Sequence, residues 1–175
     1  MLKTQHIVVT EEARPFRRLT KIALESADIH NITEVDSYQE TLCVLQNCKV
    51  DLLIFDASID DVSAFPYIRR IRCGETRQNR NVPIILLYDR EKDDVSESYL
   101  IDQATEAGAT ACVSKPLSIK KLIPVVRASL RDESADGWSE MHIVAPSRVA
   151  QLVRTRLPRV SRLFGTRNGI EGANA

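Results

Sequence analysis

Residues 51–56 read DLLIFD, four consecutive apolar residues enclosed by two aspartates, and residues 82–88 read VPIILLY. Strands that are apolar without alternation are typical of the centre of a parallel sheet, where helices cover both faces. Three further short runs, at residues 6–10, 31–36 and 109–115, have the length and branched character of strands. The sequence therefore predicts five strands, of which the two most apolar are central.

Apolar residues at helical spacing fill the segments between these strands. The stripes are Phe16, Leu19 and Ala23; Tyr38, Leu42 and Leu45; Phe65, Ile68 and Ile71; Leu100, Ala104 and Ala107; and Ile119, Leu122, Ile123, Val126 and Leu130. Ser37 and Glu40 have the spacing of a capping box at the start of the second helix, and Gly108 marks the end of the fourth. Five strands alternating with five helices predict an α/β protein with a doubly wound, five-stranded parallel sheet.

The 24 basic and 24 acidic residues cancel over the chain but are unevenly distributed. Residues 1–147 carry 18 basic and 23 acidic side chains, whereas residues 148–167 carry six arginines and no acidic residue. We therefore expect a folded domain at residues 1–132, a linker at 133–146, and a short arginine-rich extension at 147–175 that is partly helical or disordered. Its arginines are Arg148, Arg154, Arg156, Arg159, Arg162 and Arg167.

Several classes of site are excluded by composition. None of the six glycines precedes Gly74, which argues against a phosphate-binding glycine loop after an early strand. The four cysteines form no CxxC pair, so a zinc site or a disulfide framework is not expected. No stretch approaches the roughly 20 apolar residues of a membrane span, and the expectation is a cytoplasmic protein.

Charged residues stand where three of the predicted strands end. Glu11 and Glu12 follow the first strand, Asp56 ends the third, and Lys115 ends the fifth. Ligands of open parallel sheets bind at the carboxyl ends of the strands, so these side chains are the candidates for a site. Clustered carboxylates repel one another unless a cation lies between them, and their hard oxygen atoms suit Mg²⁺. A magnesium site is therefore predicted, and a flavin phosphate is disfavoured.

The stretches IVVTEE, DLLIFD, VPIILLY and AGATACVSKP, taken in this order, resemble the receiver (CheY-like) domain of two-component response regulators over roughly residues 5–131. The resemblance implies the flavodoxin-like strand order 2-1-3-4-5, numbered along the chain. It also implies that Asp56 accepts a phosphoryl group and that Lys115, followed by a cis proline, pairs with that group. The implied magnesium ligands are Glu11, Glu12, Asp56 and the backbone carbonyl of Ser58.

The sequence departs from the pattern of this family at the position that usually reports phosphorylation. Tyr88 ends the fourth strand, where the family usually has Thr or Ser, whose small hydroxyl moves to the phosphoryl group. A phenol cannot make that compact movement, and Cys112 stands where the aromatic partner of the movement is usual. We therefore treat Tyr88 as an atypical switch position and expect the phosphorylated state to be read differently.

The predicted function is that of a response regulator in a phosphorelay, a phosphoacceptor rather than an enzyme, which at most catalyses its own phosphorylation and dephosphorylation. Its expected partners are a histidine kinase or histidine phosphotransfer protein and a downstream protein target. The alternative is a phosphorylation-independent adaptor, or an effector of a second messenger of the cyclic-di-GMP type, that acts through the arginine-rich extension. Arginine binds phosphates bidentately and stacks on bases, so a cyclic dinucleotide or a nucleic acid is the candidate anionic ligand. An acidic protein, a membrane surface, or the acidic body of this protein itself are the other candidates.

Overall fold

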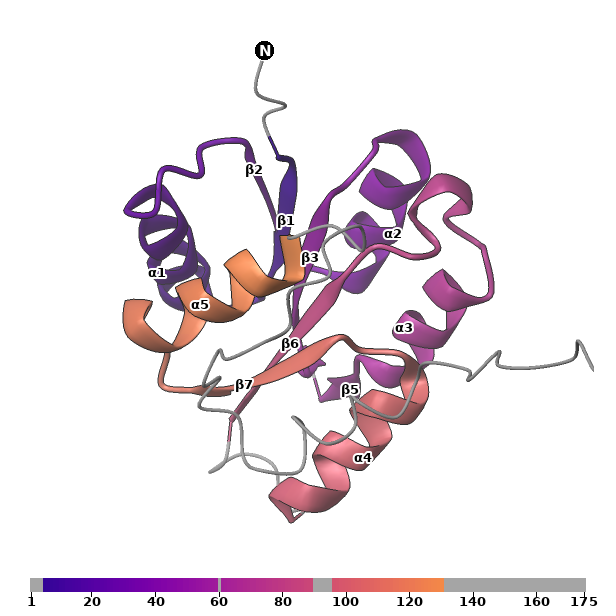
Figure 1. The fold of residues 1–175 in the computed structure, drawn as a ribbon. Coiled ribbons are helices and arrows are strands. Elements are labelled where there is room, and N and C mark those ends of the chain that lie inside the picture. The colour runs from indigo at the N-terminus through magenta and orange to yellow at the C-terminus, as the bar shows by residue number, and fades with distance from the viewer. Residues whose placement is uncertain (1–4, 60, 90–95, 131–175) are drawn as a thin grey trace, which may run out of the picture.

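The computed structural model describes residues 5–59, 61–89 and 96–130, which form a five-stranded parallel sheet between two layers of helices (Figure 1). The strands of this sheet are β1 (Ile7–Thr10), β2 (Ile32–Val35), β3 (Leu52–Asp56), β6 (Ile84–Asp89) and β7 (Ala111–Lys115). Their order is β2-β1-β3-β6-β7, and each neighbouring pair is parallel. Because β6 and β7 are the fourth and fifth predicted strands, the predicted order 2-1-3-4-5 is confirmed.

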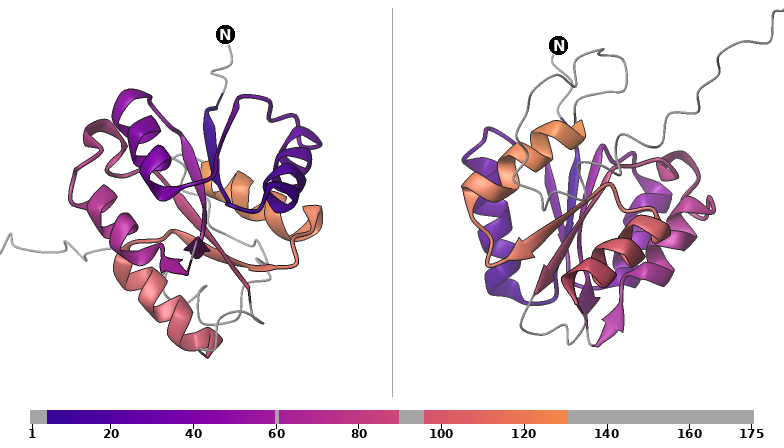
Figure 2. Two further views of the ribbon diagram at one scale, coloured as in Figure 1. Left: turned by 180° about the vertical axis from the view of Figure 1, so that it is seen from behind. Right: turned by 60° about the horizontal axis from the view of Figure 1, so that its bottom comes forward.

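Two helices cover one face of the sheet and three cover the other (Figure 2). The first pair is α1 (Arg14–Glu25) and α5 (Ile119–Leu130), and the second group is α2 (Tyr38–Asn47), α3 (Phe65–Arg72) and α4 (Glu97–Ala107). Alternate residues of β3 point to opposite layers, since Leu52 and Ile54 pack with α1 and α5 while Leu53 and Phe55 pack with the other three helices. The molecule therefore has two hydrophobic cores, one on each side of the sheet.

The two most apolar strands lie at the centre, as predicted. Every residue of β3 is buried, and so is every residue of β6 except Asp89. Burying one such Leu or Ile side chain contributes roughly 1.5–3 kcal/mol, so these strands fix the middle of the sheet. The end of β3, where Asp56 stands, is thereby fixed too.

The predicted helix boundaries are confirmed at two points. The Ser37 hydroxyl accepts a hydrogen bond from the Glu40 backbone N–H (3.3 Å) at the start of α2. Gly108 ends α4 in the left-handed region, with φ of 105°. A Cβ at residue 108 would lie 2.8 Å from Cγ of Arg72, whose Nε donates to the Gly108 carbonyl (2.9 Å). Only glycine fits this close contact between α3 and the end of α4.

A small antiparallel hairpin after β3 was absent from the prediction. It consists of β4 (Ser58–Ile59) and β5 (Val62–Ser63), which pair Ser58 with Ser63 and Ile59 with Val62. Strands of two residues are too short for any periodicity, so the sequence offers no pattern that would reveal them. The hairpin matters because it directly follows Asp56.

The predicted linker at residues 133–146 and the arginine-rich extension at 147–175 lie outside the described residues. The end of α5 at Leu130 is the last described position of the chain. In the described ranges, no helix is long and apolar enough to cross a bilayer.

A buried asparagine joins the short helix after α3 to the last turn of α2 and the segment that follows α2. Asn79 ends a short 3-10 helix, η1 (Arg77–Asn79), and is 1% exposed. Its Oδ1 accepts from the Val50 N–H (2.9 Å), and its Nδ2 donates to the carbonyls of Leu45 and Cys48 (2.6 Å each). The side chain thus bonds three backbone groups at the end of α2 and in the segment that leads to β3.

We expect Asn79→Ala to lower the free energy of unfolding by roughly 2–4 kcal/mol, because buried backbone groups would lose their partners. Urea denaturation monitored by circular dichroism measures this change. Asn47→Ala, which removes an exposed amide bonded to Cys43 in the same helix, is the control and should cost less than about 1 kcal/mol. Equal losses for the two variants would contradict the expectation.

Candidate functional site

Three charged side chains meet at the carboxyl edge of the sheet. Asp56 is the last residue of β3, Lys115 is the last residue of β7, and Glu11 directly follows β1. Lys115 Nζ lies 3.0 Å from Asp56 Oδ2 and 2.6 Å from Glu11 Oε2. A single ammonium group therefore bridges two carboxylates that come from different parts of the chain.

This cluster is almost removed from solvent. The side chains of Glu11, Asp56 and Lys115 are 3%, 9% and 10% exposed. The residue after the lysine is Pro116, and the peptide bond between them is cis, as the resemblance implied. Buried carboxylates need partners, and the geometry gives one cation to two of them.

The loop after β1 holds Glu11 from several directions. Its Oε1 accepts from the backbone N–H of Ala13 (3.1 Å), which leaves Oε2 for Lys115. Arg17 Nη1 donates to the backbone carbonyls of Glu11 (2.6 Å) and Glu12 (3.1 Å). The position of the Glu11 carboxylate is therefore fixed by the loop as well as by the ion pair.

The electrostatic environment shifts the pKa values of two members of the cluster. Burial raises the pKa of Asp56 to about 7; the Lys115 ammonium opposes this shift, and the Glu11 carboxylate adds to it. Burial lowers the pKa of Lys115, but its hydrogen bond to Glu11 and the charge of Asp56 outweigh that effect and hold the pKa above its ordinary value. The lysine is therefore charged, whereas the charged form of the aspartate is disfavoured because its surroundings compensate the charge only partly.

The donor set is compatible with Mg²⁺, although it differs from the three carboxylates predicted. Glu11 and Asp56 offer hard oxygen atoms in one place, where an ammonium already balances negative charge. Glu12 is exposed, and among the described residues no group of three or more His, Cys, Asp or Glu side chains is arranged to hold a metal. Mg²⁺ commonly uses only one or two carboxylates together with water and phosphate oxygens, so two are sufficient. The half-buried Ser58, in β4, follows Asp56 by two residues.

Tyr88, the atypical switch position, lies at the end of β6 and is 3% exposed. Its hydroxyl donates to the carboxylate of Glu97, the first residue of α4. Cys112 is half-buried in β7 and packs against the same hydrophobic core. The phenol thus links the strand that borders Asp56 to the start of a helix, a contact that its residue type alone did not reveal.

Two residues of α1 were not predicted to belong to the site. The Phe16 ring lies 5.3 Å from Lys115 Nζ although the residue is 43% exposed, so it covers one side of the ammonium. Arg17 holds the loop that carries Glu11. The sequence shows Phe16 only as part of an apolar stripe and Arg17 only as one of several basic residues. An aromatic residue and an arginine four and five positions after an acidic pair are the signals that were available.

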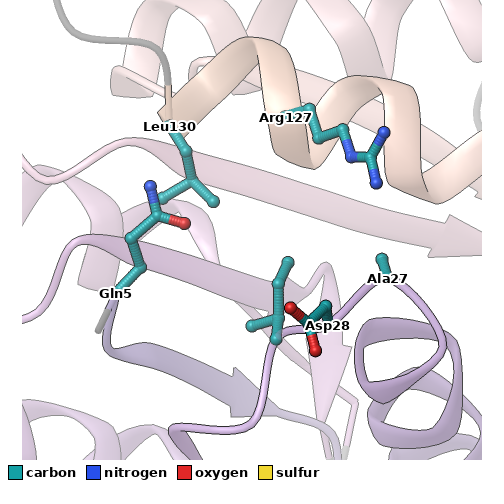
Figure 3. A pocket seen from close by; sticks show the side chains of 6 residues that line it. Gln5, Ala27, Asp28, Arg127 and Leu130 are labelled. Carbon is teal, nitrogen blue, oxygen red and sulfur yellow. The ribbon is translucent and has the colours of Figure 1, made fainter. Parts of the chain in front are cut away.

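An open pocket of about 310 Å³ lies at the opposite edge of the sheet (Figure 3). It is lined by Gln5, Ala27, Asp28, Ile29, Arg127 and Leu130, and Figure 3 shows Arg127 on α5 above the loop that carries Asp28. None of these residues belongs to the predicted site.

The fold and this cluster together define the family. The family model of the response regulator receiver domain matches residues 7–127. The chain belongs to this family. The matched range contains all three members of the cluster, Glu11, Asp56 and Lys115.

Curated relatives are similar over the same part of the chain. The phosphate regulon transcriptional regulatory protein PhoB of Pseudomonas aeruginosa is 28% identical over 137 residues, which cover 78% of this chain and 56% of that protein. The KDP operon transcriptional regulatory protein KdpE of Escherichia coli is 31% identical over 132 residues, covering 74% of this chain and 53% of KdpE. The chain thus spans about half the length of the curated relatives it matches.

Solved structures show the same fold at lower identity. A putative response regulator from Chloroflexus aurantiacus has a TM-score of 0.64 at 20% identity and covers 74% of this chain and all of that one. The receiver domain of the sensor histidine kinase PA1611 of Pseudomonas aeruginosa has a TM-score of 0.62 at 18% identity, covering 73% and 98% of the two chains. That structure is described with a magnesium ion coordinated in its active-site cleft.

The raised pKa of Asp56 predicts how stability depends on pH. In the folded protein this pKa is about 7, above the ordinary value of 3.8, so the folded state keeps a proton that the unfolded state releases between those values. The contribution of Asp56 to stability therefore falls as the pH rises from about 4 to 7 and stays low above that. Without divalent cations, Asp56→Asn should be more stable than wild type at pH 8 by roughly 1–3 kcal/mol, and the difference should shrink toward pH 4.5.

Urea denaturation in EDTA at pH 4.5, 6 and 8 measures this difference. The exposed Asp61 lies between β4 and β5, in the hairpin that follows Asp56. Asp61→Asn therefore controls for the loss of one negative charge. A difference between Asp56→Asn and wild type that stays constant across these pH values would rule out the proposed titration.

Proposed function

We propose that the chain is a phosphoacceptor of a two-component phosphorelay, in which Asp56 receives a phosphoryl group from a histidine kinase or a histidine phosphotransfer protein. The observation that carries this proposal is the buried lysine bridge between Asp56 and Glu11. A nucleophilic carboxylate, a neighbouring carboxylate that suits a divalent cation and a fixed ammonium are the groups that phosphoryl transfer requires.

Each member of the cluster has a part in the transfer. A carboxylate oxygen of Asp56 attacks the phosphorus atom while the bond between phosphorus and the histidine nitrogen of the donor breaks. The Lys115 ammonium, held by Glu11 and covered by Phe16, is in place to stabilise negative charge on the phosphoryl oxygens. When bound, Mg²⁺ would neutralise further negative charge on the carboxylates and on the phosphoryl group. Glu11, Asp56 and the backbone carbonyl of Ser58 would hold it, with the exposed Glu12 as the remaining predicted ligand.

The raised pKa of Asp56 also favours a role for a cation. A carboxylate that is partly protonated near neutral pH is a poor nucleophile, because the attacking oxygen must be free of its proton. A divalent cation beside Asp56 and Glu11 would favour the charged form and so prepare the nucleophile. We therefore expect phosphoryl acceptance to depend on Mg²⁺ and to lead, in a cytoplasmic protein, to altered contacts with a downstream protein target.

The second candidate function is that of an adaptor or second-messenger effector that works without phosphorylation. It is favoured by Tyr88, whose hydroxyl is already hydrogen-bonded to Glu97 and is carried by a bulky ring. In this case the arginine-rich extension would bind the anionic ligand, a cyclic dinucleotide or a nucleic acid. The two functions differ in whether Asp56 takes up a phosphoryl group.

Incubation with Mg²⁺ and acetyl phosphate, followed by intact-mass spectrometry, separates these functions. We expect wild type and the control Asp61→Asn to gain the mass of one phosphoryl group, and Asp56→Asn and any sample in EDTA to gain none. A related receiver that labels under the same conditions serves as the positive control. If that receiver is labelled and the wild-type chain is not, the adaptor function is the one supported.

A further inference from the structure

A buried tyrosine outside the charged cluster contacts both the backbone of Asp56 and the hairpin that follows it. Tyr38, the first residue of α2, is 4% exposed. Its hydroxyl lies 3.0 Å from the backbone carbonyl of Asp56 and 3.2 Å from that of Val62. A phenol has a single proton to donate, so the two carbonyls share one donor.

The ring of Tyr38 is fixed by aromatic neighbours on both sides. Its centroid lies 4.8 Å from that of Phe55, the residue before the phosphoacceptor, and 4.6 Å from that of Tyr67 on α3. Arg70 lies over the Tyr67 ring at 5.4 Å. Because the ring is packed between a central strand and a helix, its hydroxyl is held where the two carbonyls are.

Other hydrogen bonds hold the base of the hairpin. Its strands, β4 and β5, are two residues long, and a hairpin of this length is not stable by itself. The Ala57 N–H donates to the Leu87 carbonyl (2.7 Å), and the Ala64 N–H donates to the Ala57 carbonyl (2.9 Å). These bonds fix the base of the hairpin, whereas the Tyr38 hydroxyl reaches the Val62 carbonyl in β5.

We propose that Tyr38 is a positioning residue of the phosphoacceptor site, whose hydroxyl holds the Asp56 backbone and the β4–β5 hairpin in a fixed relation. The role rests on the proposed function of Asp56. The positioning role also concerns Mg²⁺ binding, because Ser58, the expected carbonyl ligand, lies in the hairpin. The hydroxyl, not the ring, is the group that matters, because a phenylalanine would fill the same space and leave both carbonyls without this donor.

The phenol is suited to this task at any physiological pH. Burial raises the pKa of Tyr38, and the negative charge of Asp56 raises it further. The hydroxyl therefore keeps its proton and remains a donor under all conditions in which the site would be phosphorylated.

Tyr38→Phe and Tyr67→Phe form a matched pair that isolates this hydroxyl. Each removes one oxygen atom from the same aromatic stack. The hydroxyl of Tyr67 makes no hydrogen bond within the described part of the chain, so its loss controls for the chemistry of the change. Three measurements apply to both variants: hydrogen exchange of the Val62 and Ala64 amides, binding of Mg²⁺ by NMR titration without phosphodonor, and the labelling rate with acetyl phosphate at increasing Mg²⁺.

For Tyr38→Phe we expect faster amide exchange in β5. We also expect higher Mg²⁺ concentrations for half-maximal binding and for the half-maximal labelling rate. Each change should be about fivefold, the size expected for one buried hydrogen bond. Tyr67→Phe should match wild type. A purely structural role of Tyr38 would lower the melting temperature without moving the Mg²⁺ dependence, and that result would overturn the proposal.

The outcomes also separate this inference from the function on which it rests. Wild-type protein that takes up no phosphoryl group would overturn the proposed function and this role with it. Labelled wild type together with an unchanged Mg²⁺ dependence in Tyr38→Phe would overturn only the role of Tyr38.

Discussion

The ion pair of Lys115 with Glu11 and Asp56 is the interaction on which the site depends. Removing charges from water is costly, and a buried ion pair offsets that cost only when its geometry is good and its remaining atoms are bonded. Here one ammonium lies 2.6 and 3.0 Å from two carboxylate oxygens, and the Ala13 N–H takes a third oxygen. When both carboxylates are ionised, one ammonium leaves the cluster with a net negative charge, which a divalent cation would balance.

The rest of the structure can be understood as support for this cluster. The apolar strands β3 and β6 set the position of Asp56, while Arg17 on α1 and Tyr38 on α2 hold the loops on either side of it. Each of these side chains donates to backbone carbonyls rather than to the carboxylates. Lys115 is therefore the side chain that pairs with both carboxylates, while Arg17 and Tyr38 act on the backbone that carries them.

At the switch position the residue type is unusual, but the side chain still makes a specific contact. Tyr88 departs from the small hydroxyl usual in the family, and its phenol is bonded to Glu97 on α4. The strand bordering Asp56 is thus joined to α4 through this phenol. Cys112, in the place of the usual aromatic residue, packs in the core that also holds Tyr88.

The sequence by itself determined the order of strands and helices, the central place of DLLIFD and VPIILLY, the Ser37 and Gly108 boundaries, and the residue types at the strand ends. These are local properties, because hydrophobic periodicity and capping depend on residues a few positions apart. Tyr38 shows the limit, since it fitted an apolar helical stripe and its hydroxyl gave no sign of its partners. The tertiary structure decided that Lys115 meets residues 59 and 104 positions away, that Glu12 remains exposed, and that Tyr38 reaches the hairpin. Such contacts depend on strand register and side-chain reach in three dimensions, which no spacing along the chain encodes.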